Sequence, residues 1–188
     1  SATVGLNRPF AGIAGQTILL TSGEIDVNAS ISIGGGVKIS GNSASRIFKI
    51  AALKTVSIQS LTFQDGFHKG ANGAAGVFGS PGFGGAIWNQ GTLHLLSCHF
   101  TSNHVQGGDG GAASGGPPGN GGSAFGGAIF NDATGSLDVT TCEFDGNGAL
   151  GGKGGTGTPG GTGGLADGGA LRSTSVFLSI AESTFESN

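Results

Sequence analysis

Four polar side chains that could do acid–base or metal chemistry recur at matching positions of two similar segments. His94 and His99 lie in the first segment, and Asp138 and Glu143 lie at the corresponding positions of the second. Imidazole and carboxylate groups that face one another can bind a metal ion or transfer protons. A further copy of the segment has only Ser and Thr at these positions. We therefore expect a solvated strand face with favourable cross-strand pairs rather than a catalytic or metal site.

Cys98 and Cys142 also share one position in neighbouring copies. Two cysteines provide neither a metal-ligand spacing nor a redox motif. Their expected separation permits a disulfide, but side chains that point the same way would strain it. We expect two buried thiols that pack as small apolar groups, and the sequence leaves their redox state open.

Trp88 and Phe130 are aromatic residues at equivalent positions, and the same position in the next copy is Arg172. Outward-facing aromatic rings can stack on a sugar. This pair therefore marks a possible glycan-binding surface.

These residues belong to an internal repeat. The motif Gly-Gly-Ala-Ile-Trp-Asn at 84–89 returns 42 residues later, with Phe in place of Trp, at 126–131, and in weaker form at 168–173. An eight-residue segment with apolar residues at its first, third, sixth and eighth positions occurs at 56–63, 93–100, 137–144 and 178–185, with Ser183 at the sixth position of the last copy as the one exception. Period-2 alternation that slips by one residue predicts a strand, a corner and a second strand, with one inward face.

One such rung cannot bury its own inward face, so the rungs must stack into a parallel β-helix, a solenoid. Stacking places equivalent residues over one another in ladders. The aromatic ladder is Phe63, Phe100, Phe144 and Phe185, and it is the first candidate for what fixes the register. A second inward ladder contains Leu61, Cys98 and Cys142, and an amide ladder of Asn103, Asn147 and Asn188 is expected at a corner.

Glycine-rich insertions separate the regular rungs. We expect one domain over 1–188, with irregular rungs at 17–53, regular rungs at 54–66, 84–103, 126–147 and 168–188, and insertions at 66–84, 104–126 and 148–168. Within the insertions glycine recurs at every third residue, and prolines lie near the middles of the second and third insertions. This register is typical of a polyproline-II-like helix, in which only glycine fits a crowded contact line. We expect each insertion to run out and back, so that successive pairs form a second layer; the alternative is a flexible linker.

Composition excludes several function classes. The 188 residues include 42 glycines but only 8 Lys+Arg and 11 Asp+Glu, which provides no basic face for nucleic acid. No apolar run approaches the roughly 20 residues needed for membrane insertion. A polysaccharide lyase is disfavoured because Arg46 and Arg172 are isolated and acidic residues are sparse, and no cofactor or catalytic residue is expected. Ice binding is disfavoured because the outward ladders are mixed and charged, although the glycine-rich layer is an alternative ice face.

The repeat from about 25 to 188 resembles those of secreted bacterial right-handed β-helix surface proteins, such as polymorphic outer-membrane proteins and autotransporter-type proteins. The residues that carry the resemblance are the motif at 84–89, the alternating segment that ends in Cys98-His99-Phe100, and Asn103. The resemblance implies right-handed coils, an extracellular or cell-surface location, and adhesion or scaffolding rather than enzymatic activity. We expect a structural protein whose open strand edges stack end to end on those of other copies, forming a filament, sheath or surface fibre. The alternative is a glycan-binding adhesin module that contacts a cell-surface polymer.

Overall fold

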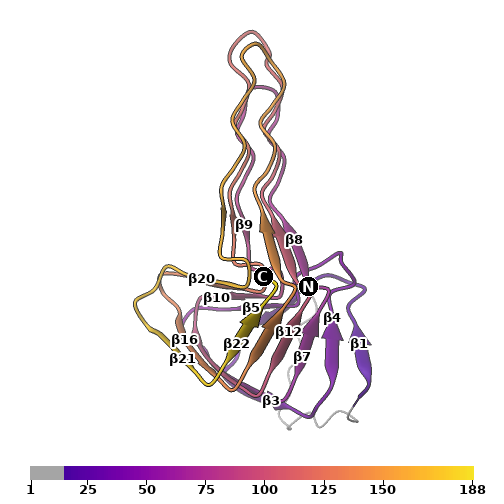
Figure 1. Cartoon of the computed structure of the whole chain (residues 1–188), viewed down its shortest axis with the longest axis vertical. Helices are drawn as coiled ribbons and strands as arrows, with labels where there is room; N and C mark the ends of the chain where they lie inside the picture. The colour runs from indigo at the N-terminus through magenta and orange to yellow at the C-terminus, as the bar shows by residue number, and fades with distance from the viewer. Residues whose placement is uncertain (1–14) are drawn as a thin grey trace.

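The structure, a computed structural model, describes residues 15–188, and within this range the chain contains β-strands and loops but no helix. Accordingly, no helix that could cross a membrane occurs in this part of the chain. The first 14 residues of the expected domain at 1–188 lie outside the described residues. Two regions are evident in Figure 1: a body of stacked coils, and a narrow stalk that rises from it. We use stalk for the insertions at 66–84, 104–126 and 148–168, and coil body for the other described residues.

Three parallel sheets form the coil body. The first runs β1 (Thr17–Leu19), β4 (Lys38–Ser40), β7 (Thr62–Gln64), β12 (His99–Thr101), β17 (Glu143–Asp145) and β22 (Thr184–Glu186). The second runs β2 (Ile25–Val27), β5 (Phe48–Ile50), β10 (Ile87–Asn89), β15 (Ile129–Asn131) and β20 (Leu171–Ser173). The third runs β3 (Ile31–Gly34), β6 (Thr55–Gln59), β11 (Thr92–Leu96), β16 (Ser136–Thr140) and β21 (Leu178–Ala181). Each coil contributes its strands in chain order, an all-β arrangement consistent with a parallel β solenoid.

The expected corner inside each rung is present. Between the third and first sheets the chain passes through one residue in the left-handed region of backbone space: Ser60, Ser97, Thr141 or Glu182, with φ of 50° to 56°. This single residue switches the side-chain alternation, so that apolar side chains on both strands point inward. The one-residue slip in the sequence pattern therefore corresponds to a turn between sheets.

Inward ladders fill the body as the pattern predicts. Parallel pairing aligns Phe63 with Phe100, Phe100 with Phe144, and Phe144 with Phe185. Successive ring centroids are 4.7, 4.7 and 4.6 Å apart, and the rings are nearly parallel. Leu61, Cys98 and Cys142 are buried beside them, and the alternating residues of the third sheet complete the core. The expected aromatic stack is thus confirmed.

Two amide ladders lie at the corners. Asn103 Nδ2 donates to Asn147 Oδ1 at 2.9 Å, and Asn147 Nδ2 donates to Asn188 Oδ1 at 2.8 Å, as expected. A second ladder, which was not predicted, joins Asn89 Nδ2 to Asn131 Oδ1 at 2.7 Å and Asn131 Nδ2 to Ser173 Oγ at 3.0 Å. The repeated motif that ends in Asn89 and Asn131 was the signal for it.

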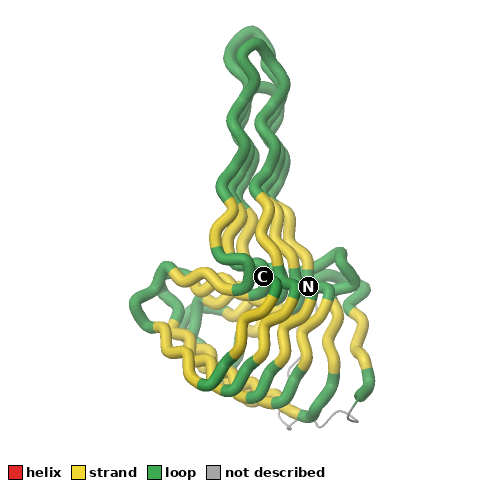
Figure 2. Tube along the Cα trace, viewed as in Figure 1, coloured by secondary structure: helices red, strands yellow, loops and turns green. Residues whose placement is uncertain are grey.

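The insertions stack on one another above the body. Their bases form two additional parallel sheets, β8 (Phe67–Lys69), β13 (His104–Gln106) and β18 (Gly148–Leu150) on one side, and β9 (Gly82–Phe83), β14 (Ala124–Phe125) and β19 (Ala166–Asp167) on the other. Above these strands the paired arms continue as loops in Figure 2. Backbone hydrogen bonds join neighbouring arms along these loops. In the structure the three insertions therefore lie stacked on one another as a second layer.

Candidate functional site

The stalk meets the coil body beside an outward row of side chains on the sheet β2–β5–β10–β15–β20. The central residues of these strands lie side by side in register, and they are Asp26, Lys49, Trp88, Phe130 and Arg172. Phe83 and Phe125, at the ends of the first two insertions, pack against this row. Charged and aromatic groups are thus gathered at the junction.

The aromatic rings at this junction pack on one another. The ring centroid of Phe83 lies 4.8 Å from that of Phe130, 5.5 Å from that of Trp88 and 5.7 Å from that of Phe125. Phe130 is only 5% exposed, which corrects its expected place on a ligand-binding surface: Phe83 and Phe125 cover it. Trp88 is half-buried, with the Lys49 ammonium 4.9 Å from its ring centroid. Little aromatic surface is left open for a sugar.

Arg46, in the segment between β4 and β5, joins the coil body to the stalk. Its guanidinium is buried, donates to the carbonyl oxygens of Phe83 and Gly84 at 2.8 to 3.1 Å, and forms an ion pair with Glu24. Burial lowers the pKa of Arg46, and the neighbouring Glu24 carboxylate opposes this shift. The same guanidinium lies 5.2 Å from the Trp88 ring centroid. A buried cation with these partners holds the base of the first insertion in place.

His68 is the second titratable group at the junction. Its Nδ1 accepts a hydrogen bond from the Phe83 backbone N–H at 3.2 Å, which requires that nitrogen to be unprotonated. Burial, with a smaller effect of the nearby Arg46 charge, lowers the pKa of His68 to about 4. At neutral pH the imidazole is therefore uncharged and acts as an acceptor for the stalk backbone.

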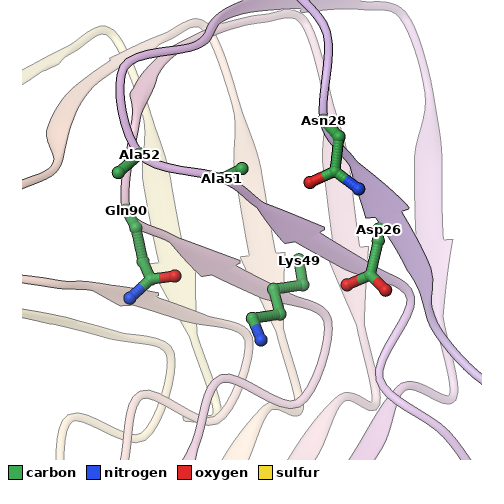
Figure 3. Close-up of a pocket in the computed structure, with 6 residues that line it drawn as sticks. All are labelled: Asp26, Asn28, Lys49, Ala51, Ala52 and Gln90. Carbon is green, nitrogen blue, oxygen red and sulfur yellow. The ribbon is translucent and has the colours of Figure 1, made fainter.

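A polar pocket of about 310 Å³ opens beside the same row. Asp26, Asn28, Lys49 and Gln90 bring a carboxylate, two amides and an ammonium group to its wall, and the small residues Ala51 and Ala52 complete it. Figure 3 shows these side chains spread around the opening rather than converging on one point. The Gln90 amide also donates to Asp132 Oδ2 at 3.2 Å. This chemistry suits the hydroxyl groups of a saccharide better than a metal ion.

The two surface imidazole–carboxylate pairs form as expected but lie on different sheets. His99 Nδ1 is 2.9 Å from Glu143 Oε2 on the first sheet, and His94 Nδ1 is 3.6 Å from Asp138 Oδ2 on the third. All four side chains are about half exposed, between 46% and 64%. They are therefore two separate cross-strand pairs on solvated faces and not one constellation.

Cys98 and Cys142 are free thiols stacked in the core. The Cys98 backbone N–H donates to Cys142 Sγ at 3.4 Å. The hydrogen bond to Cys142 and burial together raise the pKa of the Cys98 thiol. The same hydrogen bond lowers the pKa of the Cys142 thiol, although burial opposes this shift. Both thiols are almost fully buried, which fits a packing role.

No group of three or more His, Cys, Asp or Glu side chains suited to holding a metal ion occurs among residues 15–188. At the C-terminal end of the outward row, Arg172 Nε lies 2.7 Å from Asp167 Oδ2, but no hydrogen bond of acceptable geometry joins the two groups.

Comparison with known proteins found no matching family model, no similar curated protein and no similar solved structure.

Proposed function

We propose that this chain is a non-catalytic extracellular scaffold, a right-handed parallel β-helix whose coils add end to end to those of other copies. Resemblance of the repeat to secreted β-helix surface proteins supports the handedness and the location. The three-residue glycine register favours polyproline-II-like arms in the stalk. The observation that carries the proposed assembly is the chemistry of the face formed by β20, β21 and β22.

This face has the composition of an interior layer but is open. Leu178, Ile180 and Phe185 belong to the inward ladders and are 39%, 44% and 42% exposed. Their neighbours one coil earlier, Leu137, Val139 and Phe144, are exposed by 1% or less. Only the addition of another coil would bury these side chains as their equivalents in the preceding coil are buried. Such burial contributes a favourable free energy of about 25 cal/mol for each Å² of apolar surface removed from water.

The backbone at the two ends is compatible with such addition. The strands β20, β21 and β22 pair on one side only, and so do β1, β2 and β3 at the opposite end of the same three sheets, as far as residues 15–188 show. All pairings are parallel. Because the two ends differ, joining one to the other is a heterologous contact, and a heterologous contact that does not close into a ring produces a filament.

Electron microscopy and sedimentation over a concentration series test this assembly. We expect rods that lengthen with concentration, and we expect Ile180→Lys to prevent their growth because it places a charge on the open face. Leu96→Lys is the matched control, since Leu96 is 41% exposed but points outward from the same sheet. Single short rods at every concentration, or equal effects of the two substitutions, would overturn the proposal.

Saccharide binding is the second candidate, and the polar pocket at Asp26, Asn28, Lys49 and Gln90 favours it. The test is a glycan array with the wild type and Asp26→Ala, with Gln59→Ala on an outward strand position as control. We expect a signal that Asp26→Ala abolishes and Gln59→Ala preserves. Trp88→Ala is less informative because it also removes the packing with Phe83. An empty array excludes this candidate.

A further inference from the structure

Backbone hydrogen bonds give the stalk a direction. We call the arm that leads away from the coil body the outbound arm. In the outbound arms each insertion donates hydrogen bonds to the next: the N–H groups of Gly70, Gly73 and Gly76 donate to the carbonyl oxygens of Gln106, Asp109 and Ala112. The pattern repeats one level further, from Gly107, Gly110 and Ala113 to Leu150, Lys153 and Thr156. Every third N–H along these arms points toward the following insertion, whereas the N–H groups of Gly108, Gly111, Gly152 and Gly155 donate to the preceding insertion. The two faces of the layer therefore present different backbone groups.

The contact between insertions also requires glycine at four positions of each added loop. In the second insertion these are Gly108, Gly111, Gly119 and Gly122, and in the third they are Gly152, Gly155, Gly161 and Gly164. A Cβ atom on any of these residues would overlap a backbone carbonyl oxygen of the preceding insertion. Glycine is present because the neighbouring backbone occupies the space of a side chain.

The first insertion departs from this rule at all four positions. It carries Ala71, Ala74, Val77 and Ser80, whose carbonyl oxygens are the ones that the second insertion approaches. No insertion lies on its other side, because the preceding coil joins β4 to β5 through the short segment 41–47. All four residues are exposed, Val77 by 54%.

We infer that the stalk has one closed face and one open face. On the closed face, Ala71, Ala74, Val77 and Ser80 carry the Cβ atoms that stacking forbids. On the open face, backbone groups of the third insertion lack backbone partners within residues 15–188. The N–H groups without an acceptor are those of Gly151, Gly154 and Gly157, and the carbonyl oxygens without a donor are those of Gly161 and Gly164. Their equivalents in the second insertion are all paired with the third. The first insertion therefore acts as a cap, and growth of the layer is possible only from the third.

The open face thus fits one kind of partner: a bent loop with glycine at the four stacking positions, carried on a coil that pairs with β20, β21 and β22. The first insertion of a second copy does not qualify, because its alanine, valine and serine side chains would overlap the third insertion. The coils of β1 and β4, which would meet β22 in an end-to-end contact, carry no such loop. The inference therefore does not depend on the proposed filament: where β20, β21 and β22 pair with the first coil of another copy, the open face of the stalk stays unoccupied.

An added repeat tests both faces. A second copy of residues 148–188 is joined directly after Asn188, which occupies the ladder position of Asn147. We expect the new insertion to stack on the third, so that the amide protons of Gly151 and Gly154 exchange about 100-fold more slowly than in the unextended chain, as measured by NMR.

The matched control carries the residues of the first insertion in the added copy alone: Gly152→Ala, Gly155→Ala, Gly161→Val and Gly164→Ser. We expect its new strands to extend the three body sheets while the protons of Gly151 and Gly154 keep their fast exchange. Equal protection in the control would show that the first insertion is no cap. Fast exchange in both chains, with the body sheets extended, would show that the third insertion has no open face. Because a failure of filament growth changes neither result, the two proposals are separable.

Discussion

The coil body and the stalk stack in the same direction but achieve close packing by opposite means. In the body, large apolar side chains point inward and their rings stack at 4.6 to 4.7 Å. In the stalk, each later insertion approaches the preceding one with glycine, and carbonyl oxygens of the preceding insertion pack directly against these glycines. The body is stabilised chiefly by burial of apolar surface, and the stalk by backbone hydrogen bonds between close arms. The two regions should therefore respond to opposite kinds of substitution.

The largest effect is expected from removing a ring in the middle of the body. Phe100 lies between Phe63 and Phe144 and is 1% exposed, so Phe100→Ala leaves a cavity that the stacked coils cannot close. We expect a loss of about 3–5 kcal/mol in the free energy of unfolding, measured by chemical denaturation. Phe100→Leu, which retains most of the volume, should cost markedly less. A small loss in Phe100→Ala would mean that the ladder does not fix the register.

In the stalk, the addition of a single methyl group to a glycine should reduce stability. At Gly111 the added Cβ of Gly111→Ala overlaps the carbonyl oxygen of Ala74. We expect local loss of hydrogen-exchange protection in the first two insertions and a global cost of about 1–3 kcal/mol, typical of overpacking. The control is Ala74→Gly, which deletes a methyl group from the exposed face. If Gly111→Ala leaves protection in the stalk unchanged, the arms are not in contact in solution.

The contrast between the coil body and the stalk also explains which features of the structure could be predicted from the sequence. The ladders of Phe100 and Asn103 follow from period-2 alternation and a fixed repeat, because one register places all equivalent residues together. Glycine at every third residue indicated an ordered layer. The buried state of Phe130 could not be foreseen, because Phe83 and Phe125 cover it from the ends of the insertions, and no local pattern relates a loop end to a strand face.

Acid should loosen the junction between the two regions. The pKa of His68 is about 4 in the folded chain, below the ordinary value of 6.5, so the unfolded chain takes up the proton first as the pH falls. The free energy of unfolding is therefore unaffected by this group above pH 6.5, and it decreases as the pH falls from 6.5 to 4. Because the ring is partly solvated, we expect about 1 kcal/mol, seen as a lower denaturation midpoint. His68→Gln, which keeps an acceptor for the Phe83 N–H, should flatten this dependence. An unchanged pH profile in His68→Gln would place the acid sensitivity elsewhere.

The smallest effect is expected on the outward face of the body, where neither packing device operates. His99 and Glu143 are 2.9 Å apart, yet 51% and 64% exposed, so solvent screens their attraction. We expect Glu143→Gln to change the free energy of unfolding by less than about 0.5 kcal/mol. The longer pair of His94 and Asp138 offers a comparison, since Asp138→Asn should be equally silent. A double-mutant cycle on His99 and Glu143 measures the coupling directly, and 0.15 M salt should reduce it further. A coupling above about 1 kcal/mol would mean that the outward rows also hold the coils together, and that the inward ladders and the glycine contacts are not the only devices that set the stack.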